Sequence, residues 1–343
     1  MNAANQEARA GAGSKAESAP ATAEAISSVG PALETLAAAI GSVLRGKSDV
    51  VETALVCMLA EGHLLLDDVP GVGKTLLAKA MAATMGGRWS RVQFTPDLLP
   101  TDVTGVSIWQ PTTSTFEFRP GPVFANLVVC DEINRGPAKT QAALLEAMEE
   151  HGVTVDGTTY PLARPFLVIA TQNPFEQEGT YNLPESQLDR FLIRSAVGYP
   201  DRDAEVDLLT GGGADITLPT LDAVTDAAEV ARFVRLTRTV YTAPALLGYI
   251  ADIVRSTRDH PDAALGASPR GGLALMRASR ASAVLRGRSF VTPDDVRAVA
   301  HRVLDHRILV RGLTRWNREA SGAVIDDVIG RLPVPGARST SPN

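Results

Sequence analysis

The 343-residue sequence predicts an α/β protein in which a five-stranded parallel sheet is flanked by helices and followed by a small all-α domain. Up to about Pro200, short apolar runs alternate with segments of helical periodicity, the pattern of a parallel sheet covered on both faces. A glycine-rich loop follows the first apolar run and opens a helix, and polar residues follow other runs. Beyond Pro200 the patterns are helical only.

Composition is that of a soluble globular protein, with 45% hydrophobic and 21% charged residues. The net charge of -6 disfavours a protein that binds nucleic acid mainly through phosphates. Cys57 and Cys130 lie in separate apolar runs, which indicates buried reduced thiols rather than a disulfide. Because we find neither a signal peptide nor an apolar run long enough to span a bilayer, we expect a cytoplasmic location and no direct membrane insertion.

Five apolar runs are candidate strands, at residues 63–66, 91–94, 127–130, 166–170 and 192–197. Helical segments are expected at residues 29–59 (two helices around a turn at Gly46), 75–85 and 138–150. Two insertions, Gly105 to Arg119 and Gly152 to Tyr160, have the pattern of hairpins, the second around an Asp156-Gly157 turn. Functional groups should gather where the parallel strands end.

Domain boundaries follow from changes in composition. We expect a flexible tail at residues 1–28, the α/β core at 29–205, a linker at 206–224, a helical domain at 225–335 and a second tail at 336–343. Within the helical domain, Ser268-Pro269 and Thr292-Pro293 have the chemistry of helix starts.

The loop from Asp68 to Thr75 has the composition and position of a phosphate-binding loop. Its glycines would let backbone N–H groups turn toward phosphate oxygens, and the following helix N-terminus adds positive partial charge. Lys74 would meet the β- and γ-phosphates of ATP, and Thr75 would ligate Mg²⁺. The usual pattern begins with Gly where this chain has Asp68. The segment expected to contact the nucleotide is Asp68, Val69, Pro70, Gly71, Val72, Gly73, Lys74, Thr75 and Leu76.

An apolar run ends in the acidic pair Asp131 and Glu132. Asp131 would hold Mg²⁺, directly or through water. Glu132 is the candidate base that orients the water attacking the γ-phosphate. An acidic pair at a strand end is by itself more often a solvated or capping feature, but Lys74 upstream favours the catalytic interpretation.

Taken together, these motifs resemble those of the MoxR family of AAA+ ATPases. The resemblance rests on residues 131–135 (Asp-Glu-Ile-Asn-Arg) with Gln141, on 170–174 (Ala-Thr-Gln-Asn-Pro), on 183–191 (Leu-Pro-Glu-Ser-Gln-Leu-Asp-Arg-Phe) and on 266–270 (Gly-Ala-Ser-Pro-Arg). It covers roughly residues 30 to 335 in the family's order. It implies an AAA+ phosphate-loop core with a helical lid, ATP and ADP as ligands, and chaperone-like work on protein clients.

The resemblance also implies roles for three polar residues. Asn173 matches sensor 1, an amide that bonds the γ-phosphate or its attacking water, although an Asn-Pro turn is the plain alternative. Arg190 matches the arginine finger that one subunit inserts into its neighbour's site, with Arg135 and Arg194 as alternatives. Arg270 matches sensor 2 on the lid, which would sense the γ-phosphate and which we place among the nucleotide contacts. In similar proteins the segment at Gly46 lines the adenine pocket.

The same resemblance implies a hexameric ring of identical subunits and a partner with a von Willebrand factor A domain. Two other motors share these parts: a nucleic-acid translocase and the motor subunit of a metal chelatase. The hairpin from Gly152 to Tyr160 contains Asp156 and no Lys or Arg, so it is poorly suited to gripping phosphates, and we expect no nucleic-acid partner. A catalytically dead binding module would have lost one of the phosphate-site residues, and none is lost. Trp89, Trp109 and Trp316 are expected to be packing residues.

Overall fold

A five-stranded parallel sheet forms the centre of the core, with strand order β2-β5-β8-β1-β9. The computed structural model describes residues 21–69, 71–173, 180–200, 202–210, 221–313 and 316–336. The strands are β1 (Leu64–Asp67), β2 (Trp89–Gln93), β5 (Leu127–Asp131), β8 (Leu167–Gln172) and β9 (Ile193–Ser195). Each predicted strand is therefore confirmed, with ends shifted by a few residues.

Helices cover both faces of this sheet because successive strand residues point to opposite sides. Leu64 and Leu66 belong to one buried cluster, whereas Leu65 between them belongs to another. The first cluster contains side chains of α2 (Gly30–Val43), α3 (Ser48–Leu59) and α4 (Lys74–Met85). The second contains side chains of α5 (Pro100–Thr104), the 3₁₀ turn η1 (Ile133–Arg135), α6 (Ala138–Glu150) and α7 (Glu185–Leu188).

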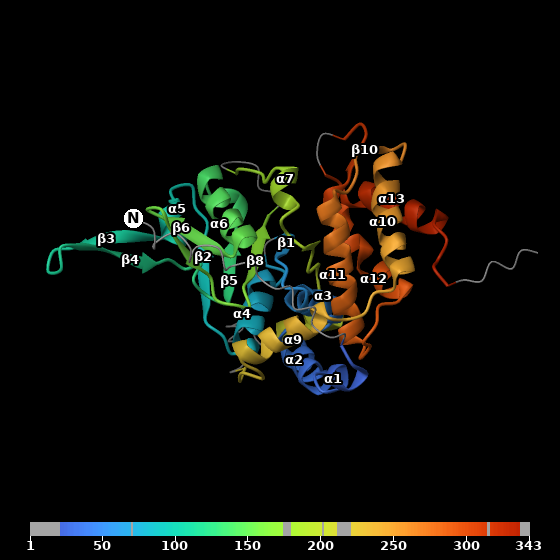
Figure 1. Ribbon diagram of the computed structural model, residues 1–343, viewed down its shortest axis with the longest axis horizontal. Coiled ribbons are helices and arrows are strands. Elements are labelled where there is room, and N and C mark those ends of the chain that lie inside the picture. The colour runs from blue at the N-terminus through green and yellow to red at the C-terminus, as the bar shows by residue number, and fades with distance from the viewer. Residues whose placement is uncertain are drawn as a thin grey trace, which may run out of the picture.

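The C-terminal part is helical, as predicted, and lies beside the sheet in Figure 1. Its elements are α9 (Ala227–Arg238), α10 (Pro244–Asp259), α11 (Pro269–Leu285), α12 (Pro293–Leu304), the 3₁₀ turn η2 (Asp305–Arg307) and α13 (Arg318–Arg331). Ser268 and Thr292 cap α11 and α12, so both expected helix starts are confirmed. A short antiparallel pair, β10 (Ala263–Leu265) with β11 (Leu309–Val310), adds a small sheet to this helical lid.

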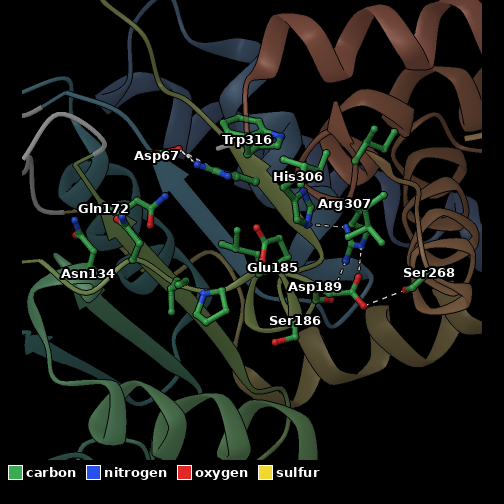
Figure 2. Close-up of a pocket in the computed structure, with 18 of the residues that line it drawn as sticks. Asp67, Asn134, Gln172, Glu185, Ser186, Asp189, Ser268, His306, Arg307 and Trp316 are labelled. Carbon is green, nitrogen blue, oxygen red and sulfur yellow. Dashed lines mark hydrogen bonds and ion pairs between the residues drawn. The ribbon is translucent and has the colours of Figure 1, made fainter. Parts of the chain in front are cut away.

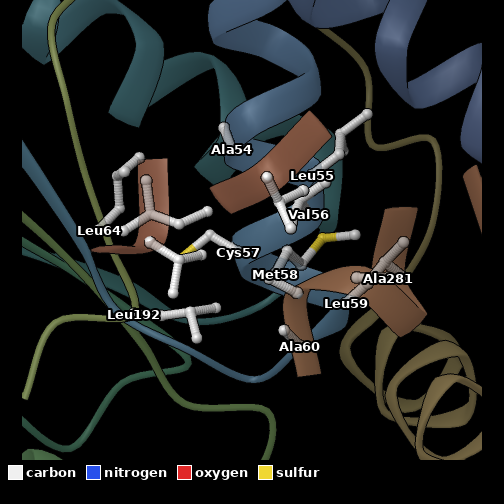
Figure 3. Close-up of a cluster of buried hydrophobic side chains, with 14 of the residues drawn as sticks. Ala54, Leu55, Val56, Cys57, Met58, Leu59, Ala60, Leu64, Leu192 and Ala281 are labelled. Atoms are coloured by element: carbon white, nitrogen blue, oxygen red, sulfur yellow. The ribbon is translucent and has the colours of Figure 1, made fainter. Parts of the chain in front are cut away.

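Helix α3 joins the two parts of the molecule. Its residues from Ala54 to Leu59 are buried, and Figure 3 shows them between Leu64 and Leu192 of the core and Ala281 of the lid helix α11. Cys57 lies in this cluster and Cys130 in β5; both are buried free thiols, and burial raises the pKa of each. One apolar cluster thus runs from the sheet into the lid, so the lid is seated on packed hydrophobic surface.

Both predicted hairpins are present. Strands β3 (Gly105–Gln110) and β4 (Thr115–Pro120) form an arm that extends away from the body in Figure 1. Strands β6 (Gly152–Val155) and β7 (Thr158–Pro161) turn at Asp156-Gly157, where both φ angles are positive. Phe118 of the arm stacks on Tyr160 of the second hairpin at 4.1 Å between ring centroids, so the two insertions share one aromatic contact.

Several boundaries and burial states differ from expectation. Helix α1 (Ala23–Ser27) lies within the stretch expected to be a flexible tail, because Ile26 is fully buried in the core cluster. Helix α8 (Arg202–Thr210) occupies the start of the expected linker. Trp89 and Trp109 are 45% and 47% exposed, so each is only partly packed, Trp109 against Phe116.

One helical stretch, Ala23–Val43, is long and apolar enough by length and composition to cross a membrane, contrary to the sequence-based expectation that no run would qualify. In the structure it is divided between α1 and α2, and Leu33, Leu36 and Ile40 of α2 belong to the core cluster. Burial of this face gives the stretch a packing role within the fold.

His63 is expected to make the protein less stable as the pH falls below neutrality. Its Nδ1 accepts the Val168 N–H at 3.0 Å and its Nε2 lies 3.3 Å from the Met148 carbonyl oxygen, an arrangement that suits the neutral ring protonated on Nε2. Desolvation lowers the pKa of His63 from 6.5 to about 3. The unfolded chain binds a proton in this pH window and the folded chain does not, so stability is lost as the pH falls from 6.5 toward 3.

Through this residue alone, we expect the free energy of unfolding to be about 2 kcal/mol lower at pH 5 than at pH 7. Urea unfolding at the two pH values measures the difference. His63→Asn retains an acceptor for the Val168 N–H but does not titrate, so it should show a weaker pH dependence. Equal pH dependence in both proteins would contradict this assignment.

Candidate active site

A cavity of about 350 Å³ opens at the carboxyl edge of the sheet, around the start of α4. Strands β2, β5 and β8 end here beside the loop that follows β1, so residues distant in sequence converge. The cavity is lined by Gly71, Gly73, Lys74, Thr75, Leu76, Arg91, Gln93, Asp131, Glu132, Thr171 and Asn173. Most of the predicted phosphate-site residues therefore meet in one place.

The loop between β1 and α4 reaches this cavity through two glycines in left-handed conformations. Gly71 has φ +84° and Gly73, the N-cap of α4, has φ +98°. A Cβ on Gly73 would meet only Leu44 at 3.7 Å, so backbone conformation rather than space requires glycine. The first N–H groups of α4 have no partner within the helix, which makes this end of the helix a suitable anion site.

Lys74, the first residue of α4, lies inside the cavity. Its Nζ donates to the Gln172 carbonyl oxygen at 2.9 Å and to the Asp68 carbonyl oxygen. Partial burial lowers the pKa of Lys74, and the nearby carboxylates oppose that shift. The ammonium group thus rests on backbone carbonyls at the cavity wall, where a phosphate oxygen would be a stronger partner.

Asp131 and Thr75 form the oxygen-rich side of the site. Thr75 Oγ1 donates to Asp131 Oδ1 at 3.2 Å, and Thr171 Oγ1 donates to the same oxygen at 3.3 Å. Within the described ranges no group of three His, Cys, Asp or Glu side chains could hold a metal alone. Mg²⁺ usually takes one or two protein oxygens and completes its shell with phosphates and water, so this pair fits it.

Glu132 follows the strand end in a conformation that few non-glycine residues adopt, with φ +56°. Its N–H donates to Thr171 Oγ1 at 3.0 Å, and its Oε2 accepts from Gln93 Nε2 at 2.8 Å and Arg135 Nη1 at 3.1 Å. The side chain is 39% exposed. The Glu132 carboxylate therefore lies at the mouth of the cavity, where it can contact water, and its orientation is fixed by these hydrogen bonds.

Three lining residues were not among the predicted site residues: Arg91, Gln93 and Thr171. Arg91 Nε donates to Asp131 Oδ2 at 2.7 Å, and the other two orient Glu132. All three lie at or near the carboxyl ends of strands adjacent to β5. Their position at this edge of the sheet was the signal that could have identified them.

Arg190 and Arg270 are absent from the described lining of this cavity. Arg190 donates from Nη1 to the Leu145 carbonyl oxygen at 2.8 Å and pairs through Nη2 with Glu149 at 3.1 Å. Arg270 pairs with the other oxygen of Glu149 at 2.5 Å. Arg270 was expected among the nucleotide contacts; in this structure Glu149, near the end of α6, holds it beside Arg190.

The structure also shows the contacts of Arg194 and Arg135, the two alternatives for the arginine finger. Arg194 is buried, bonds Asp67 through Nε at 3.0 Å, and lies 3.6 Å from the centroid of the Trp316 ring, so it is committed to its own chain. Arg135 pairs with Glu132, three residues before it in the chain, at 3.1 Å.

The remaining predicted nucleotide contacts divide between the cavity and its surroundings. Gly46 lines a separate cavity of about 780 Å³ between α2, α3 and the end of α11. The Asp68 carboxylate accepts hydrogen bonds from the N–H groups of Gly198 at 2.6 Å and Val69 at 2.8 Å. These bonds explain how the fold accommodates Asp68 where the usual pattern has glycine. Val72 packs on the core cluster, and Pro70 lies outside the described residues.

Comparison with known proteins agrees with this geometry. The profile of the ATPase family associated with various cellular activities matches residues 63–193, and the AAA lid domain profile matches residues 255–328. Chaperone MoxR1 of Mycobacterium tuberculosis is 40% identical over 328 residues, covering 93% of this chain and 86% of that protein. The chain belongs to the MoxR family of AAA+ ATPases. It is accordingly a nucleotide-binding enzyme that hydrolyses ATP.

Other relatives support the same placement of this MoxR-family ATPase. Protein MoxR of Paracoccus denitrificans is 34% identical over 334 residues, covering 88% of this chain and 95% of that protein. A crystal structure from Cytophaga hutchinsonii assigned as an ATPase superposes with a TM-score of 0.80 at 35% identity, covering 91% of this chain and 97% of that chain. An MCM homologue of Methanopyrus kandleri, at 18% identity, covers 83% of this chain and 62% of that chain with a TM-score of 0.57 and shares the fold.

Proposed function

We propose that this MoxR-family ATPase couples Mg²⁺-dependent ATP hydrolysis to the remodelling or activation of protein clients, working as a ring of identical subunits. The observation that carries the proposal is the meeting of Lys74, Thr75, Asp131 and Glu132 around one cavity. The chaperone name of the Mycobacterium tuberculosis relative supports the client class. A partner with a von Willebrand factor A domain and a cytoplasmic location belong to the same proposal, the latter supported by two buried free thiols.

In the proposed reaction, ATP binds with its β- and γ-phosphates against Lys74 and the N-terminus of α4. Thr75 and Asp131 would hold Mg²⁺, which neutralises charge on the phosphate oxygens. Glu132 accepts a proton from, and orients, the water that attacks the γ-phosphorus, while Gln93 and Thr171 keep its carboxylate and backbone in place. The Asn173 amide would bond the same water or the γ-phosphate.

In this reaction, Arg190 and Arg270 would act in the ATP site of a neighbouring subunit. Both are tied to Glu149 and neither lines the described part of their own phosphate cavity. Because two guanidinium groups converge on one carboxylate, the same patch could converge on a γ-phosphate presented by an adjacent chain. We therefore propose that each site is completed by both arginines of the next subunit.

A direct test of this function measures both ring assembly and remodelling of a protein client. Purified protein should form rings when ATP or a non-hydrolysable analogue is added, and should change the state of a bound protein client only when Mg²⁺ and hydrolysable ATP are present. Light scattering measures ring assembly, and the protease sensitivity of the client measures the change in its folded state. A monomer under all nucleotide conditions, or client remodelling without hydrolysis, would overturn the proposal.

We further propose that the β3–β4 arm contacts the client. Trp109 and Phe116 lie opposite each other on it with centroids 5.2 Å apart, and they are 47% and 70% exposed. An exposed aromatic pair offers apolar area to side chains that an unfolded polypeptide exposes. The arm also carries Glu117 and Arg119, whose opposite charges make it a poor binder of phosphates.

Replacing Trp109 and Phe116 together by Ser is expected to abolish stimulation of ATP turnover by a permanently unfolded model polypeptide while leaving basal turnover unchanged. The basal rate should survive because the arm contributes no described residue to the phosphate cavity. Leu209→Ser is the matched control, since Leu209 is 80% exposed on α8. Equal stimulation of the double variant and the control would exclude the arm from client binding.

A further inference from the structure

The segment from Asp189 to Leu192, which carries Arg190, is held by the lid of its own chain. The Arg307 side chain, only 2% exposed, donates from Nε to Asp189 Oδ1 at 2.6 Å. Its Nη2 donates to the Asp189 carbonyl oxygen at 3.0 Å and to that of Phe191 at 2.7 Å, and its Nη1 to that of Leu192 at 3.3 Å. A single lid guanidinium therefore binds the residues on both sides of Arg190.

A second lid residue, Ser268, also bonds the Asp189 carboxylate. Ser268, the N-cap of α11, donates from Oγ to Asp189 Oδ2 at 3.0 Å, so both oxygens of Asp189 are bonded to lid residues. Figure 2 shows Ser268 and Arg307 reaching Asp189 from the lid at the edge of the cavity between the two parts. This cavity of about 840 Å³ separates core and lid elsewhere, which makes the Asp189 contacts one of the bridges across it.

Arg270, the other arginine that pairs with Glu149, lies on the same lid helix that Ser268 caps. Arg270 lies two residues after Ser268 on α11 and shares Glu149 with Arg190. A buried, forked guanidinium with several fixed acceptors specifies geometry more strongly than an exposed ion pair does. A change in lid angle must then either break these bonds or move the Arg190 segment together with Arg270.

We propose that Asp189 and Arg307 are positioning residues that couple the lid angle of one subunit to the placement of its Arg190 in the neighbouring subunit's ATP site. The inference rests on the proposed function, in which Arg190 acts on the neighbour. The consequence is directional: the nucleotide state that sets one lid controls hydrolysis at the next site around the ring. Asp189 and Arg307 themselves act through Arg190 and stay in their own chain.

Mixing of variant subunits tests this coupling. Asp189→Asn keeps the shape of the side chain but weakens its bonds to Arg307 and Ser268, so turnover by the variant alone should fall about tenfold or more, part of what an arginine finger contributes. Affinity for an ATP analogue should stay within about twofold, because Asp189 is not among the described lining residues of the phosphate cavity. Asp203→Asn, in an exposed pair with Arg202 on α8, is the matched control and should behave as wild type.

An excess of Glu132→Gln subunits should restore turnover at the Asp189→Asn sites, because the Glu132→Gln subunits hydrolyse ATP at least about 10²-fold more slowly themselves but supply a correctly placed Arg190. A merely structural defect at Asp189 would remain after mixing. Wild-type turnover by Asp189→Asn alone, or a loss that the Glu132→Gln subunits do not restore, would overturn the inference.

A mixture of Arg190→Ala and Glu132→Gln subunits distinguishes failure of the lid coupling from failure of the proposed action of Arg190 on a neighbour. Restored turnover in that mixture together with none in the Asp189→Asn mixture would reject the coupling and keep the proposed function. Absence of restoration in both mixtures would reject the action of Arg190 on a neighbour, and this inference with it.

A second variant protects the test against misfolding of Asp189→Asn, which circular dichroism would reveal. Ser268→Asp retains a good N-cap for α11 but places a carboxylate beside that of Asp189. It should show the same loss of turnover and the same restoration by Glu132→Gln subunits. Full activity of folded Ser268→Asp would count against the coupling.

Discussion

Glu132→Gln is expected to lower the turnover number for ATP by about 10²–10⁴-fold, the range over which a positioned general base contributes to catalysis. The amide keeps the size of the side chain and one oxygen, but it cannot accept the proton of the attacking water. Gln93 and Arg135 bond the present carboxylate at 2.8 and 3.1 Å, so the replacement should stay close to the same position.

ATP binding by this variant should be nearly unchanged, because Lys74, Thr75 and the start of α4 are untouched. Calorimetric titration with ATP, beside a steady-state hydrolysis assay, measures the two effects separately. Glu319→Gln, an exposed carboxylate on α13, is the matched control. If Glu132→Gln turned over ATP as fast as wild type, the assignment of the base would be wrong.

Arg190→Ala is expected to reduce turnover by about 10³-fold in the assembled protein, the lower range measured for arginine fingers. The guanidinium would stabilise charge on the γ-phosphoryl oxygens of the adjacent site, and alanine offers no replacement. Within one chain Arg190 touches Leu145 and Glu149 instead of the phosphate cavity. Each subunit should therefore bind ATP with about its normal affinity while hydrolysis is lost.

The measurement is steady-state hydrolysis at protein concentrations where light scattering shows assembly. Arg232→Ala, which removes an exposed arginine paired with Glu229 on α9, controls for loss of a surface ion pair. A variant that assembles and retains more than about half of wild-type turnover would remove Arg190 from the mechanism.

The sequence predicted the core well because its signals were local. Short apolar runs such as residues 127–130, alternating with helical segments, indicate buried strands, and Gly71, Gly73 and Lys74 between a strand and a helix indicate a phosphate loop. The edge of the sheet then brought Asp131 and Glu132 to that loop, as the rule for parallel strands requires.

What the sequence could not provide depends on contacts between distant segments. Nothing near Arg270 indicates that Glu149 would hold it beside Arg190, and nothing near Asp68 indicates that its carboxylate bonds the Gly198 N–H. Ile26 appeared to belong to a flexible tail because the apolar surface that buries it comes from elsewhere in the fold. Such pairings are fixed by tertiary packing, which periodicity and composition do not report.

In the proposed function, a subunit's ATP site is incomplete until a neighbour supplies its arginines. The most direct test measures ATP turnover per subunit over a range of protein concentrations, with sedimentation velocity on the same samples. Turnover per subunit should be very low for the monomer and should rise in parallel with the fraction assembled. Constant turnover per subunit from dilute monomer to full assembly would show that each ATP site is complete within one chain.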